Sequence, residues 1–233
     1  MKKMKKMLVA VVVTMAMMCM MLTGCGQKVP AADETMSALF ELYAKENTAP
    51  MKDLLGFASD EDVINAYFEE GAIVDYAEEM AAEFTNLGLE VAEEDVQAFT
   101  DAIVAMINKA TCTVEITSEE GDVTVVTLKI NGFSTTDMYT AMEEAMNASM
   151  ENISEEDAAL IAEGDAEATA AFVKQLMQGF TDVVNAMEPV EEAVEVTVEC
   201  EKQLVDVSGE EKAAWLPTDM NGFATDVDNA IFQ

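Results

Sequence analysis

The sequence predicts an α+β fold: an antiparallel sheet of about four strands, made of two hairpins and backed by several helices. Two observations carry this prediction. Over most of the chain, apolar residues recur at spacings of three and four, as on one face of a helix. Two stretches, near the middle and near the end, are instead rich in β-branched residues that alternate with polar ones. Each stretch is long enough for two strands joined by a short turn.

The helices are predicted from apolar faces and from capping residues. Ser59 comes three residues before Asp62, and Ser154 comes three residues before Asp157, which is the spacing of a helix N-cap. The expected helices lie around residues 36–43, 59–68, 72–86, 92–109 and 136–150, in a short stretch after Ser154, and around 165–187 and 219–232.

The strands are predicted where a period of two replaces the helical period. The first hairpin has a turn of five residues, and the second has a turn near Gly209. The expected strands are Thr111–Thr117, Val123–Ile130, Val194–Leu204 and a short one around Ala213–Leu216.

Two short sequence motifs each occur twice, which indicates an internal duplication. Phe99-Thr100-Asp101 recurs as Phe180-Thr181-Asp182, and Asn131-Gly132-Phe133 recurs as Asn221-Gly222-Phe223. Their order along the chain is preserved, which favours two duplicated αββα units. The alternative is chance in a chain rich in alanine, aspartate and methionine. The predicted copies cover residues 90–150 and 165–233.

The start of the chain has the pattern of an exported lipoprotein. Four lysines lie within the first six residues, an apolar run covers residues 7–21, and Leu22-Thr23-Gly24-Cys25 follows. This pattern resembles a bacterial lipoprotein signal that ends in a lipobox. The resemblance implies cleavage between Gly24 and Cys25 and attachment of a diacylglyceryl group to Cys25. The expected organisation is a signal peptide over 1–24, a tether over 25–33 and a single α+β domain over 34–233.

The resemblance also implies a location. The apolar run of 15 residues is shorter than the ~20 that a membrane-spanning helix needs. Two acyl chains hold a protein stably on a bilayer. We therefore expect the protein on the outer face of the bacterial cytoplasmic membrane, with the membrane as a partner through the lipid anchor. The alternative is a plain secretory signal that leaves Cys25 without lipid.

Composition excludes several classes of function. Without residues 1–24, the chain has 8 lysines, no arginine and 46 acidic residues, for a formal charge of −38. Such a chain repels nucleic acid, so we expect no nucleic-acid partner. The chain has no histidine, which removes Ser-His-Asp and Cys-His catalysis and histidine metal sites. We expect no catalytic residue, no metal site and no cofactor.

Two cysteines remain after Cys19 and Cys25 are assigned to the signal and the lipid. Cys112 and Cys200 each lie in a strand-like stretch, on a face shared with apolar residues. In an exported protein two such cysteines can form a disulfide. The alternative is that both are small buried apolar residues.

One helix carries a methionine stripe. Met138, Met142, Met146 and Met150 lie at a spacing of four. Such a stripe predicts either a core face packed on the sheet or an adaptable surface for an apolar ligand or a partner protein of the envelope. Trp215, the single tryptophan, is interpreted as an anchoring core aromatic rather than a ligand platform.

Three segments resemble known families. Leu42–Asn47 and Met51–Gly56 are similar to the opening of a family of uncharacterised Gram-positive lipoproteins, in which the first helix ends in a Leu-Tyr-x-Lys-Gly-Asp-like turn. This chain has Glu46-Asn47 where Gly-Asp is usual. The strand with Trp215-Leu216-Pro217 resembles the end of cystatin-like, nuclear-transport-factor-two-like domains. That likeness implies a curved sheet backed by helices, often with an apolar pocket, and no catalytic residue follows from either family.

These observations together predict a non-enzymatic binding or interaction domain displayed at the cell surface. Two alternatives stay open. One is an enzyme of the cystatin-like cone type, or a carrier of small apolar ligands, that uses carboxylates or tyrosines. The other is a purely structural surface protein.

Overall fold

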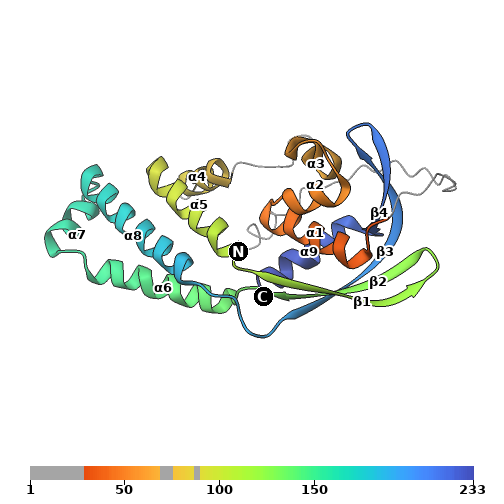
Figure 1. Cartoon of the computed structure of the whole chain (residues 1–233). Coiled ribbons are helices and arrows are strands. Elements are labelled where there is room, and N and C mark those ends of the chain that lie inside the picture. The colour runs from red at the N-terminus through yellow and green to blue at the C-terminus, as the bar shows by residue number, and fades with distance from the viewer. Residues whose placement is uncertain (1–28, 69–75, 87–89) are drawn as a thin grey trace. The chain divides into compact units, whose positions relative to one another are not determined.

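The protein is described by a computed structural model that covers residues 29–68, 76–86 and 90–233. The fold is α+β, as the sequence predicts, with one four-stranded antiparallel sheet in the described residues. The chain divides into two compact units (Figure 1). The sheet unit holds the described residues before 74, together with Ala110–Gly132 and Glu191–Gln233. The helical unit holds those from 74 to Lys109, together with Phe133–Val190.

The strands of the sheet unit follow one another in chain order, β1-β2-β3-β4, and every neighbouring pair is antiparallel. Both expected hairpins are present and lie side by side. The turn of the second one is Ser208-Gly209, with φ of 56° and 89° at its two residues, as a tight two-residue hairpin turn requires. The strands are β1 (Thr111–Glu120), β2 (Val123–Asn131), β3 (Val194–Val207) and β4 (Glu210–Pro217).

The first hairpin differs from its prediction in its turn. Strand β1 runs on to Glu120 instead of ending at Thr117, and the turn has two residues instead of five. A β-bulge between Ile116 and Ser118 shifts the register, and the hydroxyl of Thr117 donates to the carbonyl of Val125 at 3.1 Å. The bulge absorbs the extra residue, so the polar stretch after it can still pair as a strand.

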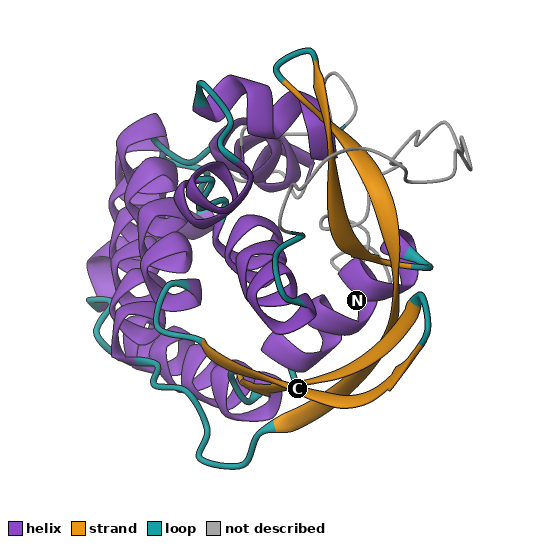
Figure 2. Ribbon diagram, turned by 45° about the vertical axis from the view of Figure 1, so that its right-hand side comes forward, coloured by secondary structure: helices purple, strands orange, loops and turns teal. Residues whose placement is uncertain are grey.

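Four helices belong to the sheet unit. Helices α1 and α9 lie on the concave side of the curved sheet (Figures 1 and 2). Helix α1 contacts β1, β2 and β4, and α9 contacts β2, β3 and β4. The helices are α1 (Ala32–Lys45), α2 (Ala49–Leu55), α3 (Asp60–Tyr67) and α9 (Met220–Ile231). The core of this unit includes Met36, Leu39, Phe40, Val126, Leu128, Ile130, Val198, Leu216, Phe223 and Val227.

The helical unit is built around α8, which contacts α5, α6 and α7. Gly179 of α8 faces α6, and a Cβ at this glycine would lie 3.6 Å from Ala145 Cβ and 3.8 Å from Ser149 Oγ. Small residues therefore bring these two helices together. The helices are α4 (Tyr76–Asn86), α5 (Glu93–Ile107), α6 (Thr135–Glu151), α7 (Glu155–Ala162) and α8 (Ala166–Ala186).

The first of the two repeated motifs forms the same local structure in both places. Buried Thr100 on α5 and buried Thr181 on α8 each donate to the carbonyl four residues earlier, at 3.0 and 2.8 Å. Both helices also carry a glutamine–aspartate hydrogen bond at the matching place. The two copies of the second motif lie in different secondary structure, because Asn131 ends β2 whereas Asn221 is in the first turn of α9. The duplication stays a prediction.

Candidate functional site

The predicted lipid attachment site lies outside the described residues, as do the whole signal peptide 1–24 and the Gly24–Cys25 cleavage point. The structure does show that the first helix begins only a few residues after Cys25 in the sequence. Helix α1 begins at Ala32, the seventh residue after Cys25. Even fully extended, seven residues span only about 25 Å. Within the part of the chain that the structure describes, no helix combines the length and the apolar composition needed to cross a bilayer.

The disulfide considered for Cys112 and Cys200 is not formed, because both are free thiols. Strand β2 lies between their strands. Cys112 pairs with Ile130, which pairs with Val194, six positions before Cys200. At ~3.3 Å per residue that offset is about 20 Å, whereas the Cα atoms of a disulfide lie about 6 Å apart. Both are shielded apolar residues instead, and burial raises the pKa of each thiol to about 12.

The methionine stripe divides along α6. Met138 is buried and Met142 is half-buried, whereas Met146 and Met150 are 39% and 57% exposed. Helix α6 packs on α8 within the helical unit, whereas the sequence pattern suggests the sheet as the partner of this stripe. The face of α6 that contacts α8 includes Ala145 and Ser149, which lie opposite Gly179. Met146 and Met150 lie beside that face. The second interpretation, an adaptable apolar surface, stays a prediction for the exposed end of the stripe.

Trp215 is not the core aromatic that the sequence indicated. It is half-buried on β4, and Lys202 of β3 lies over its ring, with Nζ 4.7 Å from the ring centroid. The register pairs the two residues directly. Lys202 also reaches Asp122 at 3.4 Å. A cation–π contact therefore holds the indole at the sheet surface.

The segments that resemble the lipoprotein family form the corner between α1, α2 and α3. The Tyr43 hydroxyl donates to the carbonyl of Tyr67 at 3.2 Å, and the Tyr67 hydroxyl donates to Met51 Sδ at 3.4 Å. The Tyr43 ring also contacts Phe68 and Phe223, with centroids 5.0 and 6.0 Å away. Burial raises the pKa of both tyrosines, so neither phenol serves as a base near neutral pH.

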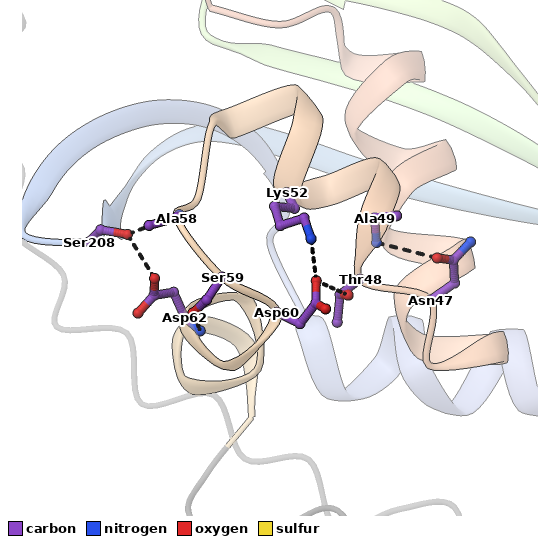
Figure 3. A network of polar contacts seen from close by, with 9 residues as sticks. All are labelled: Asn47, Thr48, Ala49, Lys52, Ala58, Ser59, Asp60, Asp62 and Ser208. Carbon is purple, nitrogen blue, oxygen red and sulfur yellow. Dashed lines mark hydrogen bonds and ion pairs between the residues drawn. The ribbon is translucent and has the colours of Figure 1, made fainter.

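Figure 3 shows the polar network on the surface of this corner. Lys52 Nζ donates to Asp60 Oδ1 at 2.6 Å, and Thr48 Oγ1 donates to the same oxygen at 2.8 Å. These hydrogen bonds, from Lys52 first and then Thr48, lower the pKa of the Asp60 carboxyl. They join the beginning of α2 to the beginning of α3, so the lysine and the aspartate are occupied in holding the corner.

The same network reaches the β3–β4 turn. Ser208 Oγ donates to Asp62 Oδ2 at 3.1 Å and accepts from the backbone N–H of Ala58 at 3.4 Å (Figure 3). Ser59 accepts from the backbone N–H of Asp62, which confirms the predicted N-cap. All of these contacts bind one part of the sheet unit to another. The resemblance therefore falls on residues that shape the fold.

Every lysine in the described ranges is engaged with a carboxylate. The seven N–O distances lie between 2.6 and 3.9 Å. The pairs are Lys45–Glu41, Lys52–Asp60, Lys109–Glu188, Lys129–Glu115, Lys174–Glu94, Lys202–Asp122 and Lys212–Glu210. Among the same residues, no three cysteine, aspartate or glutamate side chains are arranged to hold a metal ion.

Replacing Glu46 by glycine is expected to stabilise the sheet unit by about 0.5–1 kcal/mol. Glu46 ends α1 with φ of 52°, in the left-handed region, and the Asn47 N–H donates to the carbonyl of Glu41 at 3.0 Å. This is the position where the resembling family has glycine. Urea unfolding would measure the gain. Ala44→Gly, in the helical last turn, is the control and should cost about 1 kcal/mol; a loss for Glu46→Gly would contradict the assignment.

Comparison with known proteins identifies no family for this chain. No family model and no curated protein matches the chain. A crystal structure of the candidate lipoprotein ycdA from Bacillus subtilis is similar, with 14% identity and a TM-score of 0.49 over 87% of this chain. The match covers 56% of that protein, so this chain spans about half of its length. No activity, ligand or partner of this chain follows from a likeness of this size.

Proposed function

We propose that this chain is a lipid-anchored bacterial surface protein, and that its folded part is a non-enzymatic binding domain. The observation that carries the proposal is Leu22-Thr23-Gly24-Cys25, placed after a basic start and a short apolar run. The start of α1 at Ala32 supports it, because a fold that begins so soon after Cys25 would be held near the bilayer.

The state of the reactive side chains supports binding rather than catalysis. Burial raises the pKa of both thiols in the described ranges, and for Cys112 it outweighs the opposing effect of the charge of Lys45. The phenols of Tyr43 and Tyr67 are bound inside the α1–α3 corner. Exposed methionines on α6 offer apolar surface to a partner instead.

The anchor is tested by Cys25→Ala in a living bacterium that is fed an alkyne-bearing fatty acid. The wild-type chain should take up the label and sediment with membranes. Cys25→Ala should lose the label, because no thioether to the diacylglyceryl group can form. Cys19→Ala is the matched control, since it removes a thiol from the apolar run and should keep the label. Label that persists on Cys25→Ala, or that is lost equally in the control, would refute the anchor.

A further inference from the structure

We propose that an exposed apolar face of α6 docks a cationic amphipathic helix of another protein or peptide. This Met face consists of Tyr139, Met142, Met146 and Met150. This inference deepens the proposed function by naming a class of partner. It rests on the proposed surface location, because only a displayed protein would meet such partners outside the cell.

The Met face adjoins the side of α6 that packs on α8, and it turns from that side toward solvent. Its four residues follow one another at spacings of three, four and four, so they share one side of the helix. Tyr139, Met146 and Met150 are 50%, 39% and 57% exposed, and Met142 is half-buried. Gly179 of α8 instead meets α6 at Ala145 and Ser149.

The charge around the Met face selects a cationic partner. Helices α6 and α7 contain no lysine, and all of their acidic residues are exposed. Lys174, on α8, is already paired with Glu94 at 2.9 Å. The seven acidic residues of α6 and α7 are Asp137, Glu143, Glu144, Glu151, Glu155, Glu156 and Asp157. A partner with lysine or arginine beside its apolar side chains would complement both features.

The dimensions of the Met face suit a helix. From Tyr139 to Met150 it is about 16 Å long, at 1.5 Å per residue, which equals three turns. A partner helix presents apolar residues at spacings of three and four over the same length. Methionine side chains are flexible, so they adapt to differing partners. A second copy of this chain would bring more negative charge to the same surface, and an anionic bilayer would repel it in the same way.

The test measures binding of a defined peptide to the full chain carrying Cys25→Ala, which has no lipid. The probe is a fluorescent peptide of about 18 residues, long enough for a helix, with leucine on one face and lysine on the other. Its anisotropy is followed at low and at physiological salt. A peptide of the same composition in scrambled order should bind at least about tenfold more weakly, because it cannot gather its leucines on one face.

Two matched pairs of variants locate the site. Met146→Ser with Met150→Ser should weaken binding about tenfold or more, because two apolar side chains no longer become buried. Val104→Ser is the control: Val104 is 44% exposed on α5, outside the Met face, and should leave affinity within about twofold. Glu143→Gln with Glu144→Gln should weaken binding and reduce its salt dependence, whereas Glu210→Gln with Glu211→Gln on β4 should change both less.

Each outcome decides for or against the Met face. Equal binding of the ordered and scrambled peptides would show attraction by net charge alone and overturn the proposal. Unchanged affinity in the methionine variant would overturn it too, with circular dichroism showing that the variant is folded. Sedimentation that reveals a dimer lost in that variant, without peptide binding, would assign the face to a second copy. Because these measurements use lipid-free protein in solution, they stand whether or not Cys25 is lipidated in cells.

Discussion

Gly132→Ala is expected to destabilise the sheet unit by about 3 kcal/mol, the upper end of the usual cost of overpacking, because the new Cβ would meet backbone atoms instead of flexible side chains. A Cβ at position 132 would overlap the carbonyl oxygens of Ala230 and Ile231 and would lie 2.6 Å from Ile231 Cα. These atoms belong to the last turn of α9, which is buried against the sheet at Ala230 and Ile231. The clash can be relieved only by moving α9 away from the end of β2.

Urea unfolding followed by the fluorescence of Trp215 would measure this loss. Trp215 is the only tryptophan and lies on β4, so its signal reports the sheet unit. Gly179→Ala is the matched control: its new Cβ meets α6 only at ordinary contact distances. In the middle of a helix, that change should gain up to about 1 kcal/mol. A Gly132→Ala protein as stable as the wild type would refute the close approach of α9.

Leu128→Ala is expected to cost about 3 kcal/mol, the typical loss when a fully buried leucine is truncated. Leu128 has no exposed surface, and it lies in the middle of β2, paired with Val114 on one side and Val196 on the other. Because strands flank it on both sides, the cavity cannot be filled by a shift of one edge. Val123→Ala is the control on the same strand. Val123 is 37% exposed, and its truncation should cost less than about 1 kcal/mol.

The same measurement addresses the expectation that residues 34–233 form one domain. Val184, on α8, is fully buried in the helical unit. Val184→Ala should shift the transition seen by circular dichroism, because α8 is the longest described helix. In one cooperative domain, the fluorescence of Trp215 would shift with it. A fluorescence transition that stays in place would show that the two units unfold separately, and Leu128→Ala would then move only the fluorescence transition.

The elements that local chemistry specifies were predictable from sequence. Ser59 and Ser154 both cap the helices expected after them, each accepting a hydrogen bond from the backbone N–H three residues later. Both hairpins appear, because alternation of β-branched residues describes a half-buried strand directly. The bulge near Thr117 was not predictable, since a polar sequence at the end of a strand also fits a turn.

The misplaced features depend on tertiary partners. A period of 3.6 indicates that one side of α6 is apolar, but it does not identify what covers that side, and the partner is α8. Trp215 was interpreted as an anchoring core aromatic, but its strand neighbour Lys202 lies over its ring and the indole is only half-buried. The separation of Cys112 from Cys200 follows from the strand order, which spacing along the chain does not contain. For the candidate site, the methionine stripe could be recognised from the sequence. Which of its residues are exposed could be seen only in the structure.

The division of the chain bears on how the protein acquires its structure during synthesis or export. The chain passes between the two units four times, at residues 73–74, 109–110, 132–133 and 190–191. The helical unit has all of its residues once position 190 has emerged, whereas the sheet unit still lacks β3, β4 and α9. Helix α1 can meet β1 and β2 early, but its contacts with β4 and α9, and those of α3 with β3, form only after the last strands have emerged. In a nascent chain with this order of elements, the first helices stay exposed for the longest time. They are therefore the segments most accessible to chaperones and proteases.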